Sequence, residues 1–69
     1  MNSNSGSKKA FGEQIKDARE KIGLTQAQVA KKARMTVNYF AMIERGEVNP
    51  SFEKIKSIAQ VLNLKLTIS

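Results

Sequence analysis

The chain contains no cysteine and no histidine. Without thiolate or imidazole ligands a structural zinc site is effectively excluded, and no disulfide can staple the fold. The same absence removes the usual nucleophile and the usual general base, which argues against an enzyme. We therefore expect no catalytic residue, no metal and no other cofactor. A chain of 69 residues is marginally stable alone, so self-association is the remaining way to stabilise it.

Long apolar runs are also absent. No segment approaches the ~20 apolar residues that span a bilayer, and the N-terminus lacks the apolar region of a secretion signal. We therefore expect a cytoplasmic protein that does not act at a membrane.

Acidic residues are scarce: 12 Lys and Arg face six Asp and Glu, for a net charge of +6. This charge favours a polyanionic partner such as nucleic acid, although it is also compatible with a merely soluble basic protein.

Apolar residues recur at helical spacing in two clear segments. The first carries Phe11, Ile15, Ala18 and Ile22 on one face and ends at Gly23. The last begins after Pro50, with Ser51 as its N-cap, and ends at Asn63; its buried stripe is predicted to be Phe52, Ile55, Ile58, Ala59 and Leu62. Between them, Thr25 and Gln28 have the spacing of a capping box that starts another helix.

The middle stretch "KKARMTVNYF" (31–40) is ambiguous because it has neither Gly nor Pro. Thr36 is a plausible N-cap for a separate helix that ends at Gly46. However, the pattern is also compatible with one uninterrupted helix from Gln26 to Gly46. Such a helix would carry apolar residues at helical spacing on one face: Val29, Ala33, Val37, Phe40 and Ile43. Periodicity alone leaves both possibilities open.

The two ends of the chain differ in character. Residues 1–7, "MNSNSGS", are small and polar and are predicted to form a disordered tail. Residues 64–69 alternate apolar and polar side chains, which predicts a short C-terminal β-strand. Leu64, Leu66 and Ile68 share one face of it and are the candidate dimer interface, because a lone short strand needs a partner.

The stretches "GLTQAQVAKKA" and "IERGEVNPS" resemble the Cro/repressor-type (Xre-like) helix-turn-helix family, over roughly residues 10–63. The resemblance implies an all-α, lambda-repressor-like bundle of four helices, with residues 8–63 as the DNA-binding domain. It also implies a turn near Arg34 and Met35 and a recognition helix over 36–45. Arg34 replaces the family's usual left-handed Gly, at a cost of about 1 kcal/mol, so an adjusted turn is an open possibility.

The resemblance also implies roles for individual residues when the recognition helix lies in the major groove. Base contacts fall on Val37, Asn38 and Ala41; backbone contacts fall on Gln26, Thr36, Tyr39 and Arg45; and Arg19 with Glu44 forms a buried ion pair. Met42 departs from the polar or basic residue of many members, which puts a contact there in doubt. Gln26 is also expected to brace the recognition helix.

The expected function is that of a sequence-specific double-stranded DNA-binding transcriptional regulator. We expect a homodimeric repressor that occupies a palindromic operator. The alternative is an antitoxin that neutralises a partner toxin and regulates its own synthesis through the same domain, since similar C-terminal tails occur in antitoxin members of the family. RNA or membrane binding through net charge is a third, weaker hypothesis, because the apolar stripes belong to a core and only Tyr39 offers an exposed aromatic ring.

Overall fold

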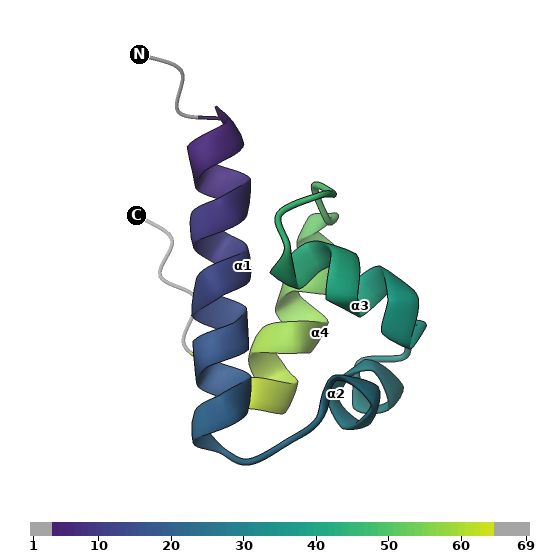
Figure 1. Cartoon of the computed structure of the whole chain (residues 1–69). Helices are drawn as coiled ribbons and strands as arrows, with labels where there is room; N and C mark the ends of the chain where they lie inside the picture. Colours follow the sequence, from purple (N-terminus) through teal and green to yellow (C-terminus); the bar gives the residue numbers. More distant parts are fainter. Residues whose placement is uncertain (1–3, 65–69) are drawn as a thin grey trace.

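The structure, a computed structural model, describes residues 4–64, with side chains from Lys8 onward. Within that range it contains four α-helices and no strand: α1 (Asn4–Lys21), α2 (Gln26–Lys32), α3 (Val37–Glu44) and α4 (Phe52–Leu62). Helices α1 and α2 each contact both α3 and α4, and Figure 1 shows the long α1 standing on one side of the three shorter helices. The all-α, four-helix prediction is confirmed.

Helix α1 begins at Asn4, earlier than the sequence pattern predicts. Its first turn therefore includes residues assigned above to a disordered tail over 1–7. Once a helix is nucleated, each further residue adds a hydrogen bond at the cost of fixing only itself, so a polar stretch can continue a helix. Residues 1–3 lie outside the described part of the chain.

The three later helices begin at the predicted caps. Thr25 Oγ1 accepts the backbone N–H of Gln28 at 3.1 Å, and the Gln28 side chain accepts the Thr25 N–H at 2.8 Å, which completes the capping box. The hydroxyl of Thr36 accepts the N–H of Tyr39 at 3.1 Å. Ser51 caps α4 in the same way. Local hydrogen bonding thus fixes where each helix starts.

The chain turns between α2 and α3, so the alternative of one uninterrupted helix is wrong. Arg34 lies in the left-handed region with φ 61°. The N–H of Met35 donates to the carbonyl of Ala30 at 2.9 Å, and the N–H of Arg34 donates to that of Lys31 at 3.2 Å. This is the Schellman pattern that usually ends a helix at Gly. The turn therefore has the geometry that it would have with Gly, and Arg34 adopts a left-handed conformation that is unfavourable for a residue with a Cβ atom.

The other helices end in the same conformation. Gly23, Gly46 and Asn63 have φ values of 75°, 74° and 58°. After Asn63, the Leu64 N–H donates to the Ala59 carbonyl at 2.8 Å. Leu64 therefore completes the cap of α4 and is not paired in a sheet, so a strand starting at Leu64 is not supported. The rest of the predicted strand, residues 65–69, lies outside the described residues.

Every helix contributes to one apolar core. Its buried members are Ile15, Val29, Ala30, Ala33, Phe40, Ile43, Ile58 and Leu62. Two residues assigned above to buried faces are exposed instead: 48% of Ile22 and 55% of Phe52 are accessible. Ile22 lies just beyond the last residue of α1, so helical spacing no longer places its side chain on the buried face. Phe52 is the first residue of α4, and helical side chains point toward the N-terminus, beyond the helix start.

Helices α1 and α3 approach so closely that only glycine fits between them. A Cβ atom added at Gly12 would lie 2.5 Å from the carbonyl oxygens of Ile43 and Glu44. A Gly inside a helix costs about 1 kcal/mol relative to Ala, so its presence marks a packing requirement. Gly12 thereby brings the C-terminal end of α3 against α1, and this contact positions the site described next.

The strained turn yields a stability prediction. We expect Arg34→Gly to raise the free energy of unfolding by about 0.5–1 kcal/mol, because Gly adopts positive φ without the Cβ penalty. Arg34→Ala is the matched control, since it also removes the charge but keeps the Cβ. Thermal and urea unfolding followed by circular dichroism measures both. Equal stability of the Gly and Ala variants would show that Arg34 is not strained.

Candidate nucleic-acid interface

Helix α3 is anchored on one face and free on the other. Phe40 and Ile43 are fully buried in the core. On the opposite side, Thr36, Val37 and Asn38 are exposed, with 47% of Val37 accessible to solvent. An α-helix held in this way can enter the major groove of B-DNA, which is wide enough to admit one. The start of α3 is therefore the candidate base-reading surface.

The remaining residues predicted for DNA contacts differ in how far they are exposed to solvent. Ala41, Tyr39 and Gln26 are half-buried, whereas Arg45 is exposed. Met42, for which no contact was predicted, is also half-buried. The Asn38 side-chain amide makes one weak contact, from Nδ2 to the Met42 sulfur at 3.9 Å. Sulfur is a poor acceptor, so both polar atoms of the Asn38 amide are available to an external partner.

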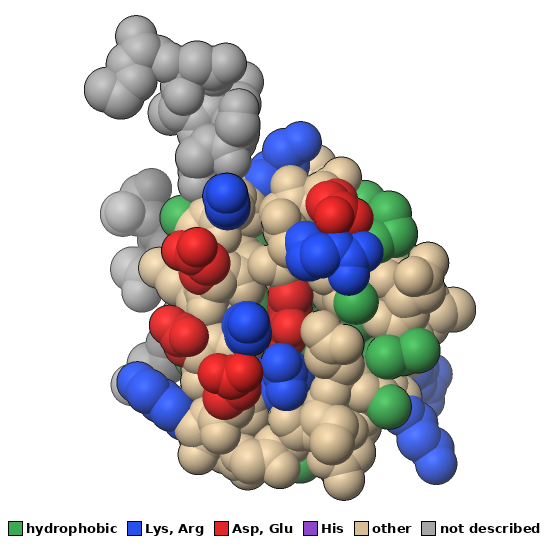
Figure 2. All heavy atoms as spheres, in the orientation of Figure 1, with side chains coloured by type: hydrophobic (Ala, Val, Ile, Leu, Met, Phe, Trp, Pro, Cys, Tyr) green, Lys and Arg blue, Asp and Glu red, His purple; other side chains and the backbone are tan. Residues whose placement is uncertain are grey.

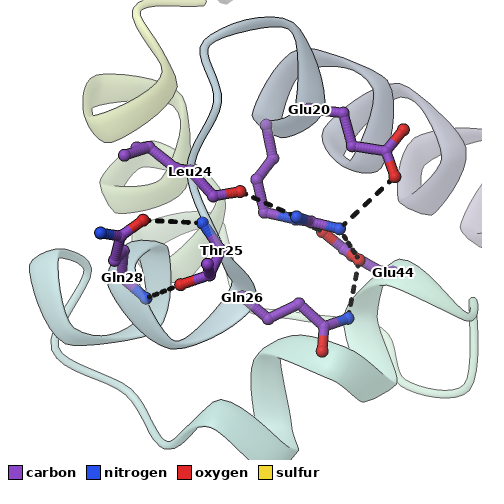
Figure 3. Close-up of polar contacts among 7 residues, drawn as sticks. Glu20, Leu24, Thr25, Gln26, Gln28 and Glu44 are labelled. Carbon is purple, nitrogen blue, oxygen red and sulfur yellow. Dashed lines mark hydrogen bonds and ion pairs between the residues drawn. The ribbon is translucent and has the colours of Figure 1, made fainter.

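A buried carboxylate joins three helices behind α3. Glu44 Oε2 accepts from Arg19 Nε at 2.6 Å, and Glu44 Oε1 accepts from Arg19 Nη2 at 3.2 Å. The Gln26 amide Nε2 donates to Glu44 Oε1 at 2.9 Å. Figure 3 shows the Gln26 amide of α2 reaching the carboxylate of Glu44 of α3, which also meets the guanidinium of Arg19. The structure thus brings together Arg19 and Glu44, the pair that the resemblance implied, and adds Gln26, for which the resemblance implied only a bracing role.

The Arg19–Glu44 ion pair is almost completely buried. Only 3% of the Glu44 side chain and 11% of the Arg19 side chain are accessible. Arg19 Nη1 also donates to the Leu24 carbonyl at 2.9 Å, a partner that sequence analysis did not identify. The hydrogen bond to Glu44 raises the pKa of the Arg19 guanidinium further above its ordinary high value. Both charges are compensated at short range, which is the condition under which buried ions are tolerated.

Arg45 makes an ion pair of a different kind at the end of α3. Its Nε and Nη2 atoms donate to the two carboxylate oxygens of Glu47 at 2.8 and 3.0 Å. About half of each side chain is accessible: 53% for Arg45 and 49% for Glu47. The hydrogen bond from Arg45 holds the pKa of the Glu47 carboxyl below its usual range. The pair therefore persists at neutral pH and is lost only as the pH falls through that lowered value.

Two cations, Arg34 and Lys54, flank the start of α3, and sequence analysis did not connect Lys54 with it. A shallow hollow of about 450 Å³ is lined by Arg34, Met35, Thr36, Tyr39 and Lys54. The turn brings Arg34 there, and α4 brings Lys54 from a distant part of the sequence. Figure 2 shows acidic side chains with Lys and Arg among them over α1, while hydrophobic side chains, with charged side chains of both signs at their margins, lie on the α3 side. Arg34 and Lys54 thus place positive charge beside the exposed start of α3.

Other kinds of site find little support in the described part of the chain. Among residues 4–64, no group of three or more acidic, Cys or His side chains is arranged to hold a metal ion. None of the helices α1–α4 is long and apolar enough to cross a membrane.

The buried network generates a prediction about stability. We expect Glu44→Gln to lower the free energy of unfolding by about 3–5 kcal/mol, because it leaves the charge of Arg19 buried without a partner. Glu47→Gln is the matched control: the substitution is identical and also removes an Arg partner, but the pair is exposed and should matter little. Chemical denaturation compares the two. A Glu44→Gln variant as stable as Glu47→Gln would contradict the assigned role of the network.

Comparison with known proteins agrees with this geometry. Residues 15–68 match the helix-turn-helix family. The immunity repressor protein of Bacillus phage phi105 is 38% identical over 56 residues, which is 81% of this chain and 39% of that protein. The transcriptional regulator ClgR of Mycobacterium tuberculosis is 33% identical over 61 residues, 88% of this chain and 54% of that protein. The chain thus spans about half, or less, of the length of these relatives.

A solved structure shares the fold over nearly the whole chain. The restriction-modification controller protein C.AhdI from Aeromonas hydrophila superposes with a TM-score of 0.87 and 25% sequence identity, covering 93% of both chains. The family match covers well over half of this chain and includes α2, α3 and the turn between them. The chain belongs to the Cro/repressor-type (Xre-like) helix-turn-helix family.

Proposed function

We propose that this protein is a sequence-specific double-stranded DNA-binding transcriptional regulator that represses by occupying its operator. The observation that carries the proposal is the anchored α3, whose first residues are exposed while Glu44 at its other end is fixed to α1 and α2. A rigid helix whose first side chains are exposed is the arrangement with which helix-turn-helix proteins read the major groove. Relatives named as a repressor and a transcriptional regulator support it.

Three side chains on α3 are proposed to read bases. Val37 offers methyl groups to the thymine methyl, and Asn38 offers an acceptor and a donor that match adenine N6 and N7. Ala41 lies one turn further along the same face and allows close approach. No covalent chemistry is involved, so the protein acts by binding alone.

Four side chains are proposed to contact the sugar–phosphate backbone. Gln26 uses one amide hydrogen for Glu44 and has a second available for a phosphate oxygen. The oxygen of the Thr36 hydroxyl accepts within the cap, so its hydrogen is free to be donated. Tyr39 offers its phenol and Arg45 its guanidinium. These contacts set the register of α3 without carrying sequence information.

Dimerisation on a palindromic operator is part of the proposal. Leu64 lies beside Phe11, Ile15 and Ala18 of α1 in an apolar hollow of about 420 Å³. We propose that Leu64, Leu66 and Ile68 form the contact between two copies. Such a contact can hold two recognition helices about 34 Å apart, one turn of DNA. Neutralisation of a toxin stays the alternative, and co-purification of a toxin would support it.

The division of roles on α3 is tested by two substitutions. Asn38→Ala should cost about 1–3 kcal/mol on the preferred duplex and little on random duplex, because only base readout is lost. Arg45→Ala should weaken both duplexes alike and flatten the dependence of affinity on salt. Fluorescence anisotropy titrations at several salt concentrations measure these effects. Equal loss on both duplexes for Asn38→Ala would show that Asn38 does not read bases.

The dimer contact is tested by truncation after Leu64, which keeps the hydrogen bond that caps α4. We expect the full chain to self-associate at micromolar concentrations and the truncated chain to be monomeric, because Leu66 and Ile68 are removed. Sedimentation equilibrium over a range of concentrations measures both. A truncated chain that dimerises as well as the full chain would move the interface to α1 or α4.

A further inference from the structure

The cation at the end of α3 is not free in the absence of DNA. Glu47 engages Arg45 through both carboxylate oxygens, at 2.8 Å to Nε and 3.0 Å to Nη2. This is the two-pronged geometry with which a guanidinium also binds phosphate. Glu47 lies only two residues beyond Arg45, in the loop that follows α3, so the pairing is built into the local backbone.

The pair changes what Arg45 presents to DNA. At distances larger than the separation of the two charges, a carboxylate in direct contact cancels most of the field of the guanidinium, and salt screens what is left beyond about 8–10 Å. The Nε–Nη2 edge is occupied, and only the other edge of the guanidinium, with Nη1, remains without a hydrogen bond to Glu47. A phosphate that binds at that edge also meets the negative charge of Glu47. Both effects weaken attraction to the DNA backbone while leaving the base-reading end of α3 untouched.

We propose that Glu47 is an affinity-setting residue that attenuates the contact of Arg45 with the DNA backbone. The proposal rests on the proposed DNA-binding function and deepens it. Because Arg45 is paired with Glu47, it contributes less to DNA binding than an unpaired arginine would. Because backbone contacts are common to every sequence, Glu47 lowers affinity for the operator and for other DNA by the same factor. Specificity, which is the ratio of the two affinities, does not change.

Removal of the carboxylate tests this directly. We expect Glu47→Gln to tighten binding about two- to fivefold, the range that corresponds to an exposed ion pair, on both the preferred and a random duplex. It should also steepen the salt dependence of affinity, since Arg45 then counts as a full cation. Glu13→Gln is the matched control, because it changes the net charge equally on the exposed surface of α1. Circular dichroism confirms that both variants are folded.

The same substitution in an Arg45→Ala background isolates the pair. There, Glu47→Gln should improve affinity no more than Glu13→Gln does, because its partner is gone. A gain from Glu47→Gln that persists without Arg45, or that Glu13→Gln reproduces in the parent, would reduce the effect to net charge and overturn the proposal. Weaker binding by Glu47→Gln would also overturn it, since Glu47 would then position Arg45. If the parent binds neither duplex, the proposed function itself fails, and this inference fails with it.

Discussion

The compensation of one buried carboxylate connects the parts of this fold. Glu44 lies at the C-terminal end of α3, almost without solvent contact, and its charge is met by Arg19 of α1 and by Gln26 of α2. An unpaired ion in this place would cost several kcal/mol, a large part of the roughly 5–15 kcal/mol that stabilises a folded domain. The arrangement of α1, α2 and α3 that satisfies Glu44 is therefore strongly preferred over others.

This constraint explains how so small a domain can present a rigid surface. The absence of a side chain at Gly12 lets α1 and α3 approach, and the ion pair is formed across that contact. The hydrogen bond from Gln26 to Glu44 also fixes the start of α2 against α3. The other end of α2 leads through the turn at Arg34 into the start of α3. Both ends of α3 are thus held, while its outward side chains stay exposed. The buried charge of Glu44 lies behind α3, whereas the exposed Arg45–Glu47 pair lies at the end of the helix and in the loop that follows it.

Much of the fold could be predicted because its signals are local. The caps at Thr25, Thr36 and Ser51 each depend on a hydroxyl and a backbone N–H three residues later, so residue type and spacing suffice. The turn at Arg34 could not be predicted from the residues alone. Its apolar neighbours keep the same phase on both sides, and a left-handed Arg is stabilised by the surrounding packing and not by its own preference. The family resemblance, and not periodicity, indicated the turn.

The site was predictable to a lesser degree. The resemblance indicated Arg19, Glu44 and Gln26, but the bond from Arg19 to the Leu24 carbonyl and the place of Lys54 beside Thr36 depend on how helices distant in sequence pack. The exposure of Phe52 and Ile22 shows the same limit, because periodicity does not apply at helix ends. The pairing of Arg45 with Glu47 could have been suspected from their opposite charges two residues apart, yet the conformation of the loop decides it.

The central claim is that the exposed start of α3, held by the Glu44 network, reads base sequence. Selection of bound duplexes from a random-sequence pool, with unlabelled competitor DNA present, tests it most directly. We expect enrichment of a short motif in two inverted half-sites about one turn of DNA apart. A bound fraction that remains as random as the starting pool would contradict it, since binding would then depend on charge alone.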